Sequence, residues 1–297
     1  TLIGAGDDVT TIQAFASMPS CFTTSSENYP VVCVKDAIAT IDGFTIDGLG
    51  LGDSNYKFSG VAFRNAGGTL QNSTIKDIRN TPFSGAQHGV GVYLYNDDTT
   101  ARTIHVLDNV ITGFQKNAMA LNASDTNPLT VDVQRNSITG QGSTDVTAQN
   151  GIQVYAMAGS GVLSDNTISG ITYDGSGWVA TSILNFYADL DTTNNTITDA
   201  HMGIYYIDAP GLIDNNDLSI IEGAGFAYGI YADDPPEALP SPLLGTSSVA
   251  SENETTEFSP MNGGVSYNAV EISNNTVDLS VTTTGSIGVE ADGGWSD

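Results

Sequence analysis

The sequence of 297 residues is poor in basic residues, with 8 Lys and Arg against 34 Asp and Glu and a net charge of −26. No Lys or Arg follows Arg135. Such a surface repels nucleic acid and anionic lipid, which excludes both as partners. The acidity has two readings: a solubility device for salty or extracellular surroundings, or Asp clusters that bind calcium through several oxygen ligands. For calcium, Asp233 and Asp234 are the candidate ligands.

Long hydrophobic runs are also absent. No stretch approaches the ~18 apolar residues that cross a bilayer, so the sequence predicts no membrane span. No signal peptide is visible at the start of the chain. The sequence has no phosphate-binding glycine loop, no Cys/His metal spacing and no Gly-x-Ser-x-Gly motif. Hydrophobic residues still make up 40% of the chain, which is enough for a packed core.

Cysteine is scarce, with Cys21 and Cys33 enclosing a short polar stretch. A disulfide that closes this loop predicts an oxidising compartment, and the alternative is two free buried thiols. Asn-x-Ser/Thr sequons fit glycosylation of a secreted protein, although Asn and Thr are common throughout the chain. The candidate acceptors are Asn72, Asn122, Asn194, Asn253 and Asn274. We therefore expect an extracellular or cell-surface location.

One phrase recurs along the chain: an Asn, then a small or polar residue, then an aliphatic residue. Its clearest copies begin at Asn109, Asn136, Asn166, Asn195, Asn216 and Asn275. A second phrase follows each first one, usually a glycine and a short strand of alternating pattern, as in Gly89-Val90-Gly91-Val92-Tyr93. Alternation with period two predicts that one set of side chains points inward, namely Val90, Val92, Ile152, Val154, Ile204 and Ile230.

These short strands cannot bury an apolar face alone, whereas strands stacked about 4.8 Å apart form a continuous core. Asparagine suits the bend because it tolerates left-handed backbone and can bond to its neighbours in a ladder. The sequence therefore predicts an all-β protein, a right-handed parallel β-helix of eight to ten rungs with variable corner loops. We expect one domain over residues 1–297, with an extruded acidic, Pro/Ser-rich loop at about 232–265.

The opening Leu2-Ile3-Gly4-Ala5-Gly6 and the later Ala39-Thr40-Ile41-Asp42-Gly43-Phe44-Thr45-Ile46 resemble the pectate-lyase-like superfamily of parallel β-helix proteins. In that superfamily such an opening rung is normally preceded by a capping segment. The resemblance therefore implies that the chain lacks its natural amino end. Because an uncapped solenoid end exposes strand edges, it also predicts self-association through the ends.

Enzymes of this superfamily act on acidic polysaccharides, and its lyases use a basic residue with a cation. A site built from His88, Asp97, Asp98 and Arg64 is the catalytic candidate. The alternative places Asp97 and Asp98 in a turn and His88 on the surface. The polygalacturonase motifs do not occur in order, because Gln87-His88-Gly89 precedes the Asp pair and no Arg-x-Lys is present. A polyanion would also be repelled unless calcium bridged the two.

Tyrosines recur in the second phrase, and we expect them to form a loose stripe on one outer face. Those residues are Tyr93, Tyr155, Tyr205 and Tyr231. Stacked aromatic rings beside amides and carboxylates suit sugar rings, although aromatic residues also favour strands for structural reasons alone.

Three functions remain open on the sequence. The first is a structural or adhesive surface protein, which self-associates and contacts carbohydrate. The second is a polysaccharide lyase or glycoside hydrolase, and the third is a calcium-dependent carbohydrate-binding module. The scarcity of basic residues favours the first over the second.

Overall fold

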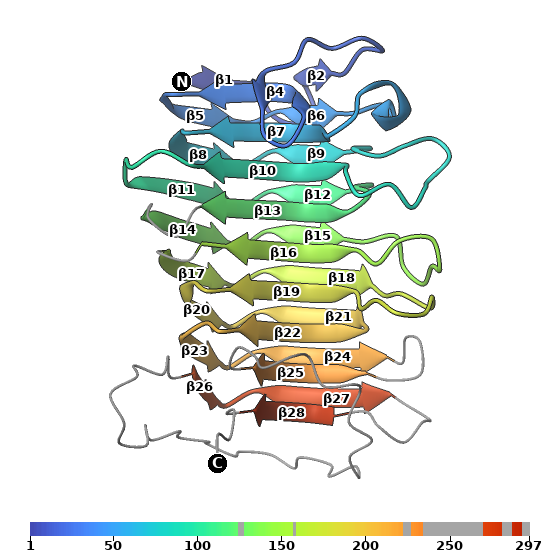
Figure 1. The fold of residues 1–297 in the computed structure, drawn as a ribbon, viewed down its shortest axis with the longest axis vertical. Helices are drawn as coiled ribbons and strands as arrows, with labels where there is room; N and C mark the ends of the chain where they lie inside the picture. Colours follow the sequence, from blue (N-terminus) through green and yellow to red (C-terminus); the bar gives the residue numbers. More distant parts are fainter. Residues whose placement is uncertain (124–127, 157–158, 222–226, 234–269, 281–286, 293–297) are drawn as a thin grey trace.

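The computed structural model describes residues 1–123, 128–156, 159–221, 227–233, 270–280 and 287–292. These residues form three long sheets that wind around one axis as a right-handed parallel β-helix (Figure 1), which confirms the predicted fold class. Two sheets have nine strands and one has ten, within the predicted range of rungs. All strand pairs among these residues are parallel except β3 with β4, which form an antiparallel hairpin. The described residues contain no α-helix long and apolar enough to cross a membrane.

Each rung contributes one strand to each sheet, in the same order. Sheet 1 consists of β1 (Leu2–Ile3), β5 (Ile38–Asp42), β8 (Gly67–Gln71), β11 (Arg102–Leu107), β14 (Leu129–Gln134), β17 (Ser160–Ser164), β20 (Asp189–Thr193), β23 (Gly211–Asp214) and β26 (Val270–Ser273). Sheet 2 consists of β2 (Thr11–Gln13), β6 (Thr45–Asp47), β9 (Thr74–Lys76), β12 (Val110–Thr112), β15 (Ser137–Thr139), β18 (Thr167–Ile171), β21 (Thr196–Ala200), β24 (Asp217–Ile221) and β27 (Thr276–Ser280).

Sheet 3 is the ten-stranded sheet. It consists of β3 (Phe22–Thr23), β4 (Glu27–Lys35), β7 (Phe58–Arg64), β10 (Val90–Asn96), β13 (Asn117–Ala123), β16 (Asn150–Tyr155), β19 (Thr181–Phe186), β22 (Met202–Ile207), β25 (Tyr228–Asp233) and β28 (Ile287–Asp292). A short 3₁₀ helix, η1 (Gly52–Ser54), lies in the connection from sheet 2 to sheet 3.

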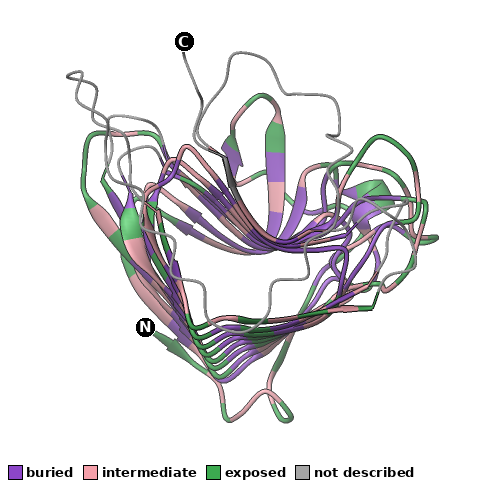
Figure 2. Ribbon diagram, turned by 90° about the horizontal axis from the view of Figure 1, so that it is seen from below, coloured by how far each residue is buried: buried purple, intermediate pink, exposed green. Residues whose placement is uncertain are grey.

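The aliphatic residues of the repeat phrase form one buried row in sheet 2. Ile46 pairs with Ile75, and the register continues rung by rung to Leu218 and Val277. Side chains such as Ile111 and Ile168 are fully buried, and Figure 2 shows the buried inner faces of the sheets along the axis. Each such side chain contributes about 1.5–3 kcal/mol, so the row accounts for much of the stability of the stack.

The asparagines of the phrase form a buried ladder at the corner between sheets 1 and 2. The Oδ1 atom of Asn166 accepts hydrogen bonds from the backbone N–H and from Nδ2 of Asn136, each at 3.0 Å. Its own Nδ2 donates to Val133 O at 2.9 Å and to Oδ1 of Asn195 at 3.0 Å. The same pattern runs from Asn109 to Asn275. The predicted ladder is therefore confirmed.

The left-handed backbone belongs to the residue before each ladder asparagine, not to the asparagine itself as we expected. This position has φ near +50° at Asp108, Arg135, Asp165, Asn194, Asn215 and Asn274, and so has Asn72, which precedes Ser73 at the equivalent corner. Its side chain points to solvent, since the chain must bend sharply there while the next residue turns inward. Three of the five sequon asparagines, Asn72, Asn194 and Asn274, occupy this exposed position. Asn122 is half-buried on sheet 3, and Asn253 lies outside the described residues.

Sheet 3 departs from the predicted alternation at one strand. Val92, Ile152, Val154, Ile204 and Ile230 are fully buried, as expected. Val90 is only partly buried and lies on the outer face, so that expectation was wrong. The repeat glycine is Gly91 rather than Gly89: a Cβ atom at Gly91 would lie 2.6 Å from Ala118 O and 2.8 Å from Ile111 Cγ2. Close packing against the isoleucine row therefore sets the glycine position, and sequence spacing alone misplaced it.

Most of the described long connections leave the helix between sheets 2 and 3, on the right of Figure 1. Ala232 and Asp233, which we expected in the extruded loop, belong to β25. The rest of that segment, from 234 onward, lies outside the described residues. Cys21 and Cys33 form the predicted disulfide, with Cα atoms 6.6 Å apart.

Candidate functional site

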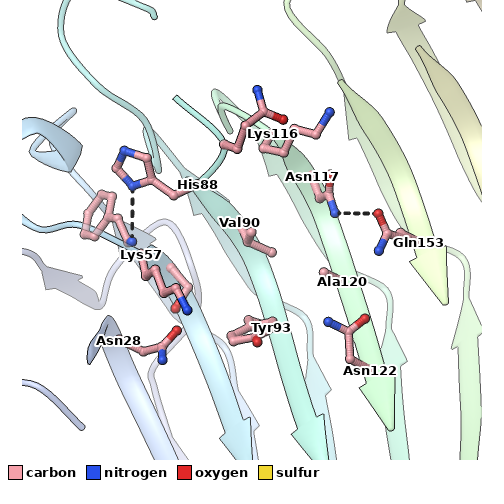
Figure 3. A pocket seen from close by; sticks show the side chains of 13 residues that line it. Asn28, Lys57, His88, Val90, Tyr93, Lys116, Asn117, Ala120, Asn122 and Gln153 are labelled. Carbon is pink, nitrogen blue, oxygen red and sulfur yellow. Dashed lines mark hydrogen bonds between the residues drawn. The ribbon is translucent and has the colours of Figure 1, made fainter. Parts of the chain in front are cut away.

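A groove of about 180 Å³ lies on the outer face of sheet 3, over the amino-terminal half of the solenoid. Its floor comes from β7, β10, β13 and β16, and Figure 3 shows the side chains around it. Most of the lining residues are polar and uncharged or basic, three are apolar, and no Asp or Glu is among them. They are Asn28, Lys57, Phe58, Ser59, Gln87, His88, Val90, Tyr93, Lys116, Asn117, Ala120, Asn122 and Gln153.

One wall of the groove is the β3–β4 hairpin, fastened by the disulfide. Cys33 pairs in register with Ala62 of β7, so the disulfide lies on the outer face of sheet 3. Phe22 of the hairpin stacks on Tyr93, with ring centroids 6.1 Å apart. The amide of Asn28 donates to Thr24 Oγ1 and Ser26 O at 3.0 Å, which keeps the hairpin tip closed. The amino-terminal hairpin is thus part of the site.

Two lysines stand at the groove without a carboxylate partner among the described residues. Lys57 Nζ donates to Thr24 Oγ1 and Ser25 Oγ of the hairpin, each at 2.7 Å. Lys116 Nζ donates to the carbonyl oxygen of Ala148. Burial lowers the pKa of both amino groups below the ordinary lysine value. The contrast with the rest of the protein is sharp, since five of the six other basic side chains form ion pairs with aspartates.

His88 lies just before β10 and Tyr93 lies within it, and both line the groove. His88 is 5% exposed, and its Nδ1 accepts a hydrogen bond from the backbone N–H of Phe58 at 3.3 Å. Burial lowers the pKa of His88, while the charge of Asp53 acts in the opposite direction. An accepting Nδ1 implies a neutral ring that carries its proton on Nε2. Burial raises the pKa of Tyr93 to about 12, so its phenol stays protonated at neutral pH.

Side-chain amides cover the remaining part of the floor. The Oε1 atom of Gln153 accepts from Nδ2 of Asn117 at 3.2 Å and from Nδ2 of Asn150 at 3.3 Å. Two other buried lining atoms, Ser59 Oγ and Asn122 Oδ1, have no hydrogen-bond partner among the described residues. Buried polar atoms are normally paired, so these two stand out beneath the groove surface as unsatisfied atoms.

The four catalytic candidates do not come together. Arg64 forms a bidentate ion pair with Asp97, at 2.6 and 2.9 Å, and stacks on Tyr95. Asp98 pairs instead with Arg102, which holds the pKa of Asp98 well below its usual range. Both pairs lie at the carboxyl ends of β7 and β10, whereas His88 precedes β10. Ser59, at the groove, and Arg64 are five residues apart on one strand, or about 17 Å.

All four candidate tyrosines lie on the outer face of sheet 3, but in two rows. Tyr93 shares a row with Tyr205 and Tyr231, whose ring centroids are 5.0 Å apart. Tyr155 lies two residues further along its strand, in the row of Tyr95. There it contacts Phe186 and Tyr187, at 5.8 and 5.4 Å. Tyr155 is the most exposed of the four, at 38%.

The metal candidates give no cluster in the described part of the chain. No group of three or more His, Cys, Asp or Glu side chains could hold an ion there. Asp233 lies at the end of β25, 3.4 Å from the hydroxyl of Tyr205, and Asp234 falls outside the described residues.

A family model described as right-handed beta helix region matches residues 59–233, more than half of the chain. The protein therefore belongs to the right-handed β-helix family, a class defined by its fold. Comparisons with curated proteins and with solved structures give no match.

Sequence reasoning missed most of the groove. Lys57 and Lys116 each come directly before a strand of sheet 3, at the corner where loops of unequal length enter. Their neighbours Phe58 and Asn117 begin equivalent strands, so an alignment of strand starts would have placed both lysines at one edge. Asn28 and the hairpin gave no such signal, because that segment precedes the regular repeat.

Proposed function

We propose that this chain is an extracellular β-helix protein that binds a glycan on the outer face of sheet 3. The groove carries the proposal: it presents amides, hydroxyl groups and Tyr93 together, and Ser59 Oγ and Asn122 Oδ1 have no hydrogen-bond partner among the described residues. Aromatic faces beside convergent polar groups suit sugar rings.

The tyrosines beyond the groove extend this surface toward the carboxyl end. Tyr155 lies beside the groove residue Gln153 on β16, and Tyr205 and Tyr231 follow on β22 and β25. Rungs stack about 4.8 Å apart, which is close to the length of one sugar unit in an extended chain. A polysaccharide that lies along the axis would meet groove and tyrosines in turn.

The extracellular part of the proposal has separate support. The disulfide Cys21–Cys33 fits an oxidising compartment. Asn72, Asn194 and Asn274 offer exposed acceptors for glycans at one corner of the solenoid. Association through the strand edges at the two ends stays a prediction.

Glycan binding can be tested by isothermal titration against a panel of neutral and acidic oligosaccharides of two lengths. Ala120 is 4% exposed and lies on the groove floor, so Ala120→Leu fills the groove. We expect this variant to bind any ligand at least tenfold more weakly. Ala101→Leu adds the same bulk at an exposed position just before β11 and is the matched control.

A second variant separates the groove from the tyrosine rows. Tyr231→Ala should weaken binding of a long oligosaccharide but leave a short one unchanged, because only a long chain reaches β25. If no glycan of the panel binds, or if Ala120→Leu binds as tightly as the unmodified chain, the proposal is wrong. Cleavage of any oligosaccharide during the titration would show an enzyme instead of a binding protein.

A further inference from the structure

The outer face of sheet 3 changes in character toward its carboxyl end, on the neighbouring strands β22, β25 and β28 (Figure 1). Tyr205 lies in register with Tyr231, and Tyr231 lies in register with Glu290. The ring centroids of these two tyrosines are 5.0 Å apart, and the ring of Tyr228 lies 5.6 Å from that of Tyr231. The three tyrosines, Glu290 and Asp233 are all partly exposed. These five residues form a tyrosine–carboxylate face.

The amino-terminal part of the same sheet shows that a tyrosine and a carboxylate placed in this way accept a cation. Arg64 on β7 lies in register with Tyr95 on β10. Its guanidinium group lies over the ring of Tyr95, 5.1 Å from the centroid, and pairs with Asp97 at 2.6 and 2.9 Å. Both contacts favour positive charge, one through the face of the ring and one through charge-assisted hydrogen bonds.

The tyrosine–carboxylate face repeats this arrangement without the arginine. Tyr231 and Asp233 are two residues apart, as are the tyrosine and the aspartate around that arginine. The in-register position that corresponds to the arginine holds Tyr205, whose hydroxyl donates to Asp233 Oδ2 at 3.4 Å. No Lys or Arg follows Arg135 in the sequence. The rungs of this part of the stack therefore contain no ammonium or guanidinium group of their own.

Negative charge acts on the rings of the face. Burial, and next the charge of Asp233, raises the pKa of Tyr205, while burial and Glu290 raise the pKa of Tyr228. Both phenols therefore stay protonated at neutral pH, and the carboxylates carry the charge. Glu290 lies one rung from Tyr231, about 4.8 Å, and Asp233 lies two residues along the strand, about 7 Å. A cation over the ring of Tyr231 is thus attracted by both carboxylates.

We infer that the tyrosine–carboxylate face binds the ammonium groups of a glycan, so that the ligand of this protein carries amino sugars. The inference rests on the proposed function and adds the chemical class of the ligand. A glycan fits the face better than a basic peptide, because tyrosine rings suit the faces of sugar rings and because the face continues the outer surface of sheet 3 beyond the groove. The net charge of −26 attracts such a polymer at long range.

The test uses two β-1,4-linked hexamers that differ only at their nitrogen atoms, one of glucosamine and one of N-acetylglucosamine. At pH 5.5 the amino groups of glucosamine are protonated, and this pH lies well above the ordinary pKa of carboxyl groups, about 4. Titration calorimetry of the unmodified chain should show at least tenfold tighter binding of the glucosamine hexamer. Its affinity should fall as salt rises, because salt screens the attraction.

Variants assign the preference to the face. Asp233→Asn and Glu290→Gln should each weaken binding of the glucosamine hexamer about two- to fivefold. Binding of the N-acetylated hexamer should stay unchanged in both, which also reports that the fold is intact. Tyr231→Ala should weaken both hexamers, because both stack on its ring. Glu271→Gln removes the same charge at an exposed position of β26, on sheet 1, and should have no effect on either hexamer.

Equal affinity for the two hexamers would overturn the inference while the glycan proposal stands. So would a preference that Glu271→Gln reduces as much as Glu290→Gln, because it would come from the general acidity of the chain. Glucosamine binding that survives Ala120→Leu but is weakened in Asp233→Asn would support the face and overturn the role of the groove. Hexalysine, titrated separately, tests the other partner: its binding through Asp233 and Glu290, with neither hexamer bound, would overturn both the inference and the glycan proposal.

Discussion

The Asn ladder offers the sharpest test of how this chain holds its stack together, and Asn166 is the position to change. It lies at the centre of the described solenoid and is 1% exposed. Asn166→Ala removes four hydrogen bonds: two that its amide donates to Val133 and Asn195, and two that its Oδ1 accepts from Asn136. The backbone N–H of Asn136 then loses its partner in a buried site.

The magnitude follows from these losses. A buried donor without a partner costs about 1–3 kcal/mol, and each further hydrogen bond contributes about 1 kcal/mol net. Since Nδ2 of Asn136 keeps its bond to Val106 O, the losses are not fully additive. We expect Asn166→Ala to lower the free energy of unfolding by about 3 kcal/mol, measured from urea unfolding followed by circular dichroism.

The chain itself supplies a rescue variant. At the equivalent corner position Ser73 uses its Oγ to accept the backbone N–H of Phe44, at 3.2 Å. Asn166→Ser should therefore restore a partner for Asn136 and recover part of the loss. Thr167→Ala, at the exposed neighbouring position, should change stability by less than about 0.5 kcal/mol. If the alanine variant is as stable as the unmodified chain, or the serine variant is no better than alanine, the ladder argument fails.

Two further predictions test the core and the groove. Gly91→Ala should lower the free energy of unfolding in urea by about 1–3 kcal/mol, because its Cβ would meet Ala118 O and Ile111 Cγ2. Ser182→Ala, in the same row of sheet 3, should leave stability unchanged or raise it, because that buried hydroxyl has no partner among the described residues. Burial lowers the folded-state pKa of His88, so its contribution to stability is present above the unfolded value of about 6.5 and is lost as pH falls through the folded pKa. The drop in thermal midpoint between pH 7.5 and pH 5.5 should shrink in His88→Asn, whose Oδ1 can accept the Phe58 N–H without titrating; an unchanged drop would contradict this assignment.

The sequence was sufficient for the fold because the repeat carries its own physical signature. Each ladder Asn must be followed by an aliphatic residue two positions later, and this local rule placed Ile111, Ile138 and Ile168 in one buried row. The rule is independent of loop length, so irregular spacing between copies did not disturb it. The choice of Gly89 as the repeat glycine of β10 was wrong, and it led to the wrong orientation for Val90. From the sequence alone Gly89 and Gly91 are indistinguishable, because nothing in it says which one packs against Ile111.

The groove could not be predicted in this way, because it depends on the lengths of connections that carry no repeat. Lys57, His88 and Lys116 are separated by 31 and 28 residues, and they meet only because three unequal loops end at the same edge of sheet 3. The hairpin that supplies Thr24 and Ser25 is fastened by the disulfide above that edge. The net charge made an acidic ligand seem unfavourable for the whole chain unless calcium bridged the two. What matters for binding is the local balance: two lysines are among the lining residues of the groove and no carboxylate is, although the whole chain has a net charge of −26.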